Sequence, residues 1–339
     1  MDFIPSFKGD PDRFRGCIIA GAAGDALGYA VEFDRLSTII KEFGPKGITA
    51  YKLTGGAAII SDDTQMTLYT LDGLFHGRAD GDYIGAIDRS YQDWLITQSG
   101  GGKPSRGKQS ILNEIPELNH PRAPGNTCLS ALHKSVRGST KAPINSSKGC
   151  GGIMRVAPCG LYFSDVEKAA KIAAEAAALT HGHELGWLPA AALAAMVNLA
   201  AWTDLLFYDL VDEAMATIGR LWPDAEHLPE LNALIEKTVD LSMSGETDRD
   251  AIRLLGEGWV GDEALAIALF CVLRHPDNIK DCLIAAVNHD GDSDSTGSIA
   301  GNLLGARLGL SAVPQELREN LELDDILFGL AGKLCRYAE

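Results

Sequence analysis

The chain has 339 residues and a formal net charge of −16 at pH 7, because its acidic residues outnumber its basic ones by 46 to 30. With 46% hydrophobic and 22% charged residues, the composition is that of a globular protein and excludes disordered, collagen-like and coiled-coil chains. So acidic a chain repels phosphate backbones, so we expect no general nucleic-acid binding. Backbone N–H groups could still bind one small phosphorylated ligand.

Helical periodicity dominates the sequence, and convincing strand patterns are nearly absent. A capping box of Ser164 and Glu167 is expected to start the helix at residue 166. The weak strand candidate is Gly47 to Leu53. In chain order, the predicted helices cover residues 13–27, 63–76, 82–98, 125–137, 166–180, 188–202, 205–221, 229–243, 262–273, 279–288 and 295–309.

Loops are expected at residues 99–108 and 138–152, and apolar periodicity continues on both sides of each, so neither is a domain linker. The longest apolar stretch, residues 187–207, has about membrane length, but polar residues and a proline interrupt it, which favours a buried core helix. We therefore predict one compact all-α domain over residues 1–339, with no membrane partner.

The cysteines and the N-terminus bear on the cellular compartment. Seven scattered cysteines with no Cys-x-x-Cys pair indicate neither a disulfide framework nor a thiolate zinc site, and favour a reducing compartment. The N-terminal residues show no basic region followed by an apolar core, so no secretory signal is predicted. We expect a cytoplasmic protein.

Two acidic clusters directly precede predicted helices: Ser61-Asp62-Asp63-Thr64, and the run from Asp290 to Thr296. Helix capping explains one acid per helix but not several neighbouring carboxylates, which repel one another. Clustered carboxylates and hydroxyls are ligands for Mg²⁺, Mn²⁺ or Ca²⁺. A calcium loop fails on spacing, because residues 295 and 301 are Ser and Gly where Gly and Glu would be needed. A two-metal site built from both clusters fits better.

Two glycine-rich stretches are more ambiguous. Glycines 21, 24 and 28 lack the strand that a dinucleotide-binding fingerprint requires, so close helix packing is an equally good explanation. Glu32 ends this stretch and is a candidate additional acid. Residues 147–155 could cradle an oxyanion with backbone N–H groups, beside Lys148 or Arg155. An ordinary flexible loop is the alternative.

Taken together, these segments resemble the ADP-ribosylglycohydrolase family, which includes dinitrogenase-reductase-activating glycohydrolases and ADP-ribosyl-acceptor hydrolases. The similarity runs from about Arg13 to Gly309, and its specificity lies in the order and spacing of the motifs. The matching segments are Gly24 to Gly28 with Glu32, Ser61 to Thr64, Gly125 to Thr127, Gly149 to Arg155, Thr180-His181, Gly256 to Trp259, and Gly291 to Gly297.

The resemblance implies an all-α fold with two divalent cations, Mg²⁺ or Mn²⁺. It implies metal ligands at Ser61, Asp62, Asp63, Asp292, Asp294 and Ser295, and catalytic acids at Glu32, Asp62 and Asp294. The implied contacts to ADP-ribose are Gly125, Asn126, Thr127, Gly149, Cys150, Gly151, Gly152, Ile153, Met154, Arg155, His181 and Trp259. For Trp259, an ordinary packed tryptophan is the alternative.

The chain departs from the family pattern at Ala123, where some members carry an aspartate near the scissile ribose, and at Asp290, where small polar residues are frequent. Either Asp93 or Asp290 could replace the missing acid.

The implied activity is metal-dependent removal of ADP-ribose from a protein side chain, with N-linked arginine favoured and Glu32 or Asp62 as the base. A silent ADP-ribose-binding relative, a hydrolase of serine-linked or O-acyl ADP-ribose, and a phosphoesterase are the alternatives. An ADP-ribosylating transferase or toxin would act in opposition.

Overall fold

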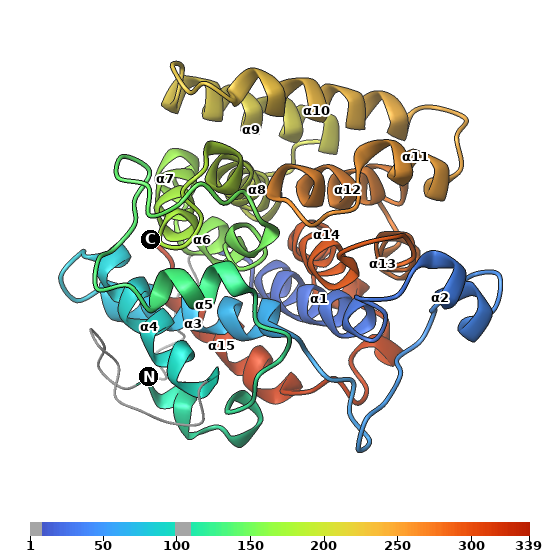
Figure 1. Cartoon of the computed structure of the whole chain (residues 1–339), viewed down its shortest axis with the longest axis horizontal. Helices are drawn as coiled ribbons and strands as arrows, with labels where there is room; N and C mark the ends of the chain where they lie inside the picture. Colours follow the sequence, from blue (N-terminus) through green and yellow to red (C-terminus); the bar gives the residue numbers. More distant parts are fainter. Residues whose placement is uncertain (1–8, 99–109) are drawn as a thin grey trace, which may run out of the picture.

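The computed structural model describes residues 9–98 and 110–339, and every regular element in these ranges is a helix (Figure 1). The all-α prediction is therefore confirmed, while the loop expected at 99–108 lies outside the described residues. The α-helices are α1 Pro11–Tyr29, α2 Leu36–Phe43, α3 Asp62–Gly77, α4 Tyr83–Gln98, α5 Asn126–Leu132, α6 Ala157–Tyr162, α7 Val166–Ala178, α8 Glu184–Trp202, α9 Phe207–Leu221, α10 Leu228–Ser242, α11 Asp248–Leu255, α12 Gly261–Arg274, α13 Ile279–Val287, α14 Ser293–Leu308 and α15 Asp324–Tyr337. Short 3-10 helices are η1 Ile111–Glu114, η2 Pro116–Leu118, η3 Cys150–Gly152, η4 Leu310–Ala312 and η5 Gln315–Leu317.

All of the predicted helical windows contain a helix, but some local predictions are wrong. The window 125–137 ends early, as α5, because residues 133–137 are all exposed and bury no apolar face. The helix α7 is capped by Asp165, whose side chain accepts from the Lys168 N–H, and not by Ser164. The helices α2, α6, α11 and α15 were not predicted; the first three are too short, at six to eight residues, to show a clear period.

The strand predicted at Gly47 to Leu53 is also wrong. The backbone of Ile48 pairs with a side chain instead of a neighbouring strand: its N–H donates to Asn288 Oδ1 at 2.8 Å, and its carbonyl accepts from Asn288 Nδ2 at 2.9 Å. One amide side chain thus satisfies both backbone groups in an irregular segment.

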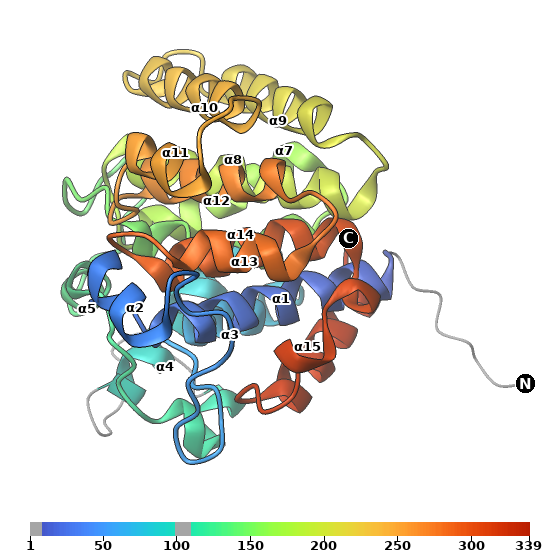
Figure 2. The same cartoon turned by 90° about the vertical axis from the view of Figure 1, so that its right-hand side faces the viewer.

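The centre of the fold is an antiparallel pair, α1 and α14, which lie side by side in Figures 1 and 2. Small residues every four positions form the seam, where positions 16, 20, 24 and 28 of α1 face 305, 301, 297 and 293 of α14. A Cβ added to any glycine in this seam would overlap backbone atoms of the partner helix. The glycines at 24 and 28 therefore allow close helix packing. A dinucleotide-binding fingerprint is excluded, because its glycines would lie in a turn between a strand and a helix, whereas these lie inside α1.

Other helices form layers around this pair. In both views α9 and α10 make an outer layer at the top, above α7, α8 and α12 (Figures 1 and 2). The helix α8 is long and apolar enough to cross a membrane, but 94% of its apolar window is buried inside the protein. This confirms the prediction of a core helix. Because α1 and α14 are antiparallel, the end of α1 meets the start of α14, and the start of α3 packs beside them.

Candidate active site

A cavity of about 420 Å³ lies where the end of α1 meets the starts of α3 and α14. The structure thus brings both acidic clusters and Glu32 to one place. The residues that line the cavity are Glu32, Phe33, Asp62, Asp63, Ala123, Pro124, Gly125, Asn126, Cys150, Gly151, Met154, Trp259, Asp292, Asp294 and Ser295. Five of them are acidic and none is basic, so the cavity suits a cationic ligand.

Helix capping accounts for part of each acidic cluster. The Ser61 hydroxyl caps α3 by accepting from the Asp63 N–H at 3.1 Å, and the Asp292 carboxylate caps α14 by accepting from the Ser295 N–H at 3.2 Å. Asp62 is held differently, since its Oδ2 accepts from the Gly125 N–H at 3.2 Å. One cap per helix therefore does not explain why several carboxylates gather at these two helix starts.

Asp25 is a further buried acid, outside the two acidic clusters and not predicted as a site residue. Its carboxylate accepts from the backbone N–H groups of Ser61 and Thr64, at 2.9 and 3.1 Å, and from the Thr64 hydroxyl. It thereby fastens the start of α3 to the C-terminal part of α1. Burial raises its pKa to about 6, although the hydrogen bonds from Thr64 and Ser61 oppose this rise. The signal that could have identified it is its place inside the Gly24-Asp-Ala-Leu-Gly28 motif.

The carboxylates of the cavity repel one another in a buried setting. Burial, followed by the charges of Asp292 and Asp62, raises the pKa of Glu32 to about 9. Burial and neighbouring acids also raise the pKa of Asp63 and Asp294 well above the ordinary range. Two buried oxygens, Glu32 Oε2 and Asp63 Oδ1, have no hydrogen-bond partner. Buried, unpaired acid oxygens are costly, and a bound cation would remove that cost.

The donor set of the cavity fits hard divalent cations, because it consists of carboxylate and hydroxyl oxygens. Within the described ranges, however, no three Asp, Glu, His or Cys side chains are arranged as a ready-made metal site. The thiol of Cys150 lies among the acids and donates to Asp292 Oδ2 at 2.7 Å. The cavity therefore contains the types of oxygen ligand that a divalent cation needs. Its acidic side chains are not arranged around one common centre.

The glycine segment, Gly149 to Arg155, forms one wall of the cavity. Of its residues, Cys150, Gly151 and Met154 line the cavity, whereas Gly149, Gly152 and Ile153 do not. A backbone pairing holds the segment in place: the Cys150 N–H donates to the Trp259 carbonyl at 3.1 Å, and the Gly261 N–H to the Lys148 carbonyl at 2.8 Å. The same pairing brings Trp259 to the cavity.

His181 lies behind the glycine segment and does not line the cavity. Its ring is so close that a Cβ added to Gly151 would come within 3.0 Å of it. The ring Nδ1 lies 2.8 Å from Thr180 Oγ1. Burial, together with the charge of Arg155, lowers the pKa of His181 to about 3, so the ring is neutral. The structure thus places His181 as a support for the wall and not as a group facing a ligand.

The expectation that Arg155 contacts a phosphate is wrong for this structure. Its side chain is fully buried, and its Nη2 donates to the Ala176 carbonyl at 3.1 Å and to Thr180 Oγ1 at 2.6 Å. Its guanidinium also lies over the ring of Tyr91, 4.5 Å from the centroid. Arg155 therefore organises the core behind His181. A motif position could not show in which direction the side chain points.

The entrance of the cavity carries two exposed aromatic residues. Phe33 is 75% exposed and Trp259 is 40% exposed, and their rings stack with centroids 6.4 Å apart at an angle of 18°. Because Trp259 is this exposed, the alternative interpretation, in which it is an ordinary tryptophan packed in the core, is excluded. Phe33 was not predicted, although it follows Glu32 directly in the sequence. Beside the entrance, Gly125 and Asn126 line the cavity, while Thr127 contacts the Ser147 hydroxyl at 3.2 Å.

Neither candidate for the missing acid at Ala123 occupies that place. Ala123 lines the cavity with a positive φ of 51°, which is unusual for a residue with a Cβ. Asp93 is buried inside α4, away from the cavity lining, and Asp290 Oδ1 accepts from the Leu36 N–H at 2.8 Å. The cavity wall at Ala123 is therefore uncharged.

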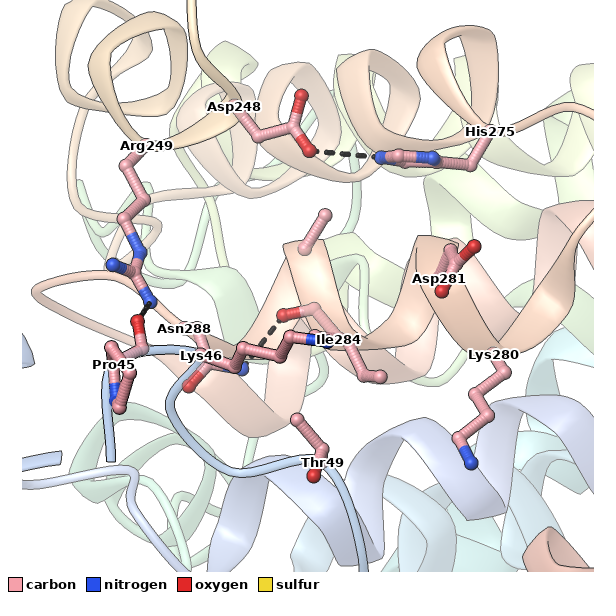
Figure 3. A pocket seen from close by; sticks show the side chains of 11 residues that line it. Pro45, Lys46, Thr49, Asp248, Arg249, His275, Lys280, Asp281, Ile284 and Asn288 are labelled. Carbon is pink, nitrogen blue, oxygen red and sulfur yellow. Dashed lines mark hydrogen bonds and ion pairs between the residues drawn. The ribbon is translucent and has the colours of Figure 1, made fainter. Parts of the chain in front are cut away.

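A second cavity, of about 600 Å³, lies between residues 45–49, α11 and α13 (Figure 3). Its acids and bases are mixed and largely paired: Asp248 contacts His275 at 2.9 Å, and Lys280 contacts Glu316 at 2.8 Å. It contains no cluster of like charges, so the chemistry of the two acidic motifs belongs to the first cavity.

The fold and the cavity together describe an all-α protein with an acidic ligand pocket, and comparison with known proteins identifies its class. The profile of the ADP-ribosylglycohydrolase family matches residues 8–339, so the chain belongs to this family of hydrolases, which act on ADP-ribosylated substrates. Similar curated proteins include the ADP-ribosylhydrolase ARH3 of Homo sapiens, which is 26% identical over 91% of this chain and 89% of its own.

Two further comparisons point the same way. The ADP-ribosyl-[dinitrogen reductase] glycohydrolase of Rhodospirillum rubrum is 26% identical over 95% of this chain and 97% of its own. A solved structure described as an ADP-ribosylglycohydrolase-related protein complex superposes with a TM-score of 0.65 at 23% identity, covering 97% of this chain and 99% of that one. This last likeness supports the fold alone.

Proposed function

We propose that this protein is a divalent-metal-dependent hydrolase that releases ADP-ribose from modified protein side chains. The observation that carries the proposal is the cavity of five carboxylates, which contains no basic residue and two unpartnered buried oxygens, in a chain of this family. A pocket built only to bind a nucleotide would have no need to bury so many uncompensated acids.

The chemistry of the donor set assigns the cation ligands. Ser61, Asp62 and Asp63 would provide one group of oxygens, and Asp292, Asp294 and Ser295 the other. When bound, Mg²⁺ or Mn²⁺ would supply Lewis acidity, orient the ribose hydroxyls and lower the pKa of a bound water. The surrounding carboxylates keep the cavity negative, which suits the positive charge that develops on a ribosyl group during cleavage.

Between the two candidate bases, the hydrogen bonds favour Glu32. Asp62 Oδ2 already accepts from the Gly125 N–H, whereas Glu32 Oε2 has no partner and faces the same cavity. Burial and the neighbouring acids raise the pKa of Glu32, but bound divalent cations would offset those charges and lower it, so that the unpartnered oxygen could accept a proton from water. We assign Glu32 as the proton acceptor, and Asp62 and Asp294 as acids that hold the cations.

The rest of the cavity provides surfaces for ADP-ribose. Backbone N–H groups of Gly151 on one wall and of Asn126 on another offer donors suited to a diphosphate, whereas those of Cys150 and Gly125 already donate to the Trp259 carbonyl and to Asp62. The exposed rings of Phe33 and Trp259 at the entrance offer an apolar face to the base.

For the linkage, we propose arginine-linked ADP-ribose. A guanidinium keeps its positive charge after modification, and the cavity offers five acids and no basic residue to meet it. The uncharged wall at Ala123 would leave room for a bulky side chain. Either a transferase of the same cell or a toxin could supply the substrate, since both need the same site in the hydrolase.

The decisive experiment incubates the protein and Mg²⁺ separately with arginine-, serine- and carboxylate-linked ADP-ribosyl proteins, and measures free ADP-ribose. We expect release from arginine, its loss on chelation, and its recovery on adding metal back. Glu32→Gln should abolish turnover, whereas the exposed Asp212→Asn on α9 should not. Release from serine alone would overturn the linkage. Binding of ADP-ribose without any release would favour a silent relative, and phosphate release from model esters would favour a phosphoesterase.

A further inference from the structure

The start of α2 is capped by a residue far away in the sequence. Its N-cap position is Arg35, whose side chain makes no capping hydrogen bond. Asp290 Oδ1 accepts from the Leu36 N–H at 2.8 Å instead. A carboxylate at a helix start satisfies a free N–H group and interacts favourably with the helix dipole. The position of α2 therefore depends on Asp290.

This contact joins the two chain segments that carry opposite sides of the candidate active site. Glu32 lies four residues before Leu36, in a tight turn closed by the bond from the Asp34 N–H to the Val31 carbonyl at 2.9 Å. Asp290 lies two residues before Asp292, which caps α14. Because both connections are short, the bond between Leu36 and Asp290 limits how far Glu32 can move from the carboxylate cluster.

Two other contacts join the Glu32 segment to residues 257–259, a neighbouring segment that bonds to Asp292 through the Glu257 carbonyl, but they constrain Glu32 less. Arg35 pairs with Glu257 at 3.2 Å, yet both side chains are at least half exposed, so solvent screens the pair. The stacked rings of Phe33 and Trp259 are also open to solvent. Of the two hydrogen bonds, the one to Asp290 is shorter and partly buried, whereas the one between Arg35 and Glu257 is exposed.

Glu32 itself has little that fixes its position. Its Oε2 is buried without a hydrogen-bond partner, and its neighbours in the cavity are repelling acids. Hydrogen bonds to a side chain would keep it in place even if its backbone moved. Without them, the position of the carboxylate depends on the position of the backbone. Small displacements of a reacting group cost large factors in rate.

We propose that Asp290 is a positioning residue for Glu32: by capping α2 from the loop before Asp292, it holds the Glu32 segment against the carboxylate cluster. This inference rests on the proposed function, in which Glu32 accepts the proton. It also gives a role to a carboxylate of the acidic run that does not line the candidate active site.

The test compares Asp290→Ala with Asp290→Asn, because an asparagine oxygen can still accept from the Leu36 N–H. We expect the alanine variant to lower kcat by about tenfold or more while KM changes less, and the asparagine variant to recover most of kcat. Asp165→Ala is the matched control, since it removes a carboxylate cap from α7, which does not line the cavity. It should lower stability without changing kcat.

A second measurement, hydrogen–deuterium exchange, separates this inference from the proposed function. Asp290→Ala should speed exchange in peptides covering residues 30–43, and Asp165→Ala should not. Unchanged exchange there, an unchanged kcat, or an asparagine variant as slow as the alanine variant would each overturn the positioning role. If the wild-type protein releases no ADP-ribose at all, the proposed function fails, while the exchange result still decides whether Asp290 holds this segment.

Discussion

The α-carbon of Gly28 in α1 lies directly against the backbone carbonyl of Ser293 in α14, with no room for a side chain between them. This contact sets the distance between the end of α1, which leads to Glu32, and the start of α14, which carries Asp294. The spacing of the candidate active site is thus decided by backbone packing.

Gly28→Ala should therefore destabilise the protein by about 1–3 kcal/mol or more, because the added Cβ meets rigid backbone atoms that cannot rotate away. Urea unfolding measures the loss. Gly329→Ala in α15 is the control, because its added Cβ meets no atom of another element within 4 Å. It should raise stability by about 0.5–1 kcal/mol, since alanine favours helix over glycine. Equal effects at both positions would argue against the packing role of Gly28.

Asp63→Asn should have opposite effects with and without divalent cations. In a chelator, removing one of several repelling buried carboxylates should stabilise the fold by on the order of 1 kcal/mol. With Mg²⁺ or Mn²⁺ at about 100 times the dissociation constant, the wild-type protein should gain about 2.7 kcal/mol, and the variant much less. Urea unfolding with chelator and with metal gives both values. An equal gain in both proteins would remove Asp63 from the cation site.

Arg155→Lys should reduce stability far more than ligand affinity. A lysine cannot donate to both the Ala176 carbonyl and the Thr180 hydroxyl while lying flat over Tyr91, so a buried charge loses partners at a cost of about 3–5 kcal/mol. For the fraction that remains folded, calorimetry with ADP-ribose should give a dissociation constant close to that of the wild type. A large loss of affinity in a protein of unchanged stability would restore the phosphate contact.

His181 should make stability depend on pH in weakly acidic solution. Its pKa falls from an ordinary 6.5 to about 3 in the fold, so the unfolded chain takes up a proton below about pH 6.5 that the folded chain does not. Stability should then fall with decreasing pH between these values, by up to about 1.4 kcal/mol per pH unit. Comparing urea unfolding of the wild type and His181→Gln at several pH values isolates this slope. Parallel profiles would show that His181 has the same pKa in the folded and the unfolded protein.

The sequence by itself determined the helical architecture and the location of the acidic motifs, because both depend on local patterns. Apolar periodicity marks a helix within about a dozen residues, and capping residues mark its start. The acids at residues 62–63 and 292–294 stand at the starts of α3 and α14, where such patterns place them. The resemblance to a family then connected these motifs with one another.

Only the tertiary structure decided which way the side chains point. Arg155 is part of a glycine-rich motif typical of phosphate sites, yet the packing of α7 and Tyr91 places its guanidinium in the core. Asp290 belongs to an acidic run typical of metal ligands, yet it caps a helix 254 residues away. A motif specifies which groups are available, whereas burial and partners depend on contacts between distant segments, which no local pattern contains.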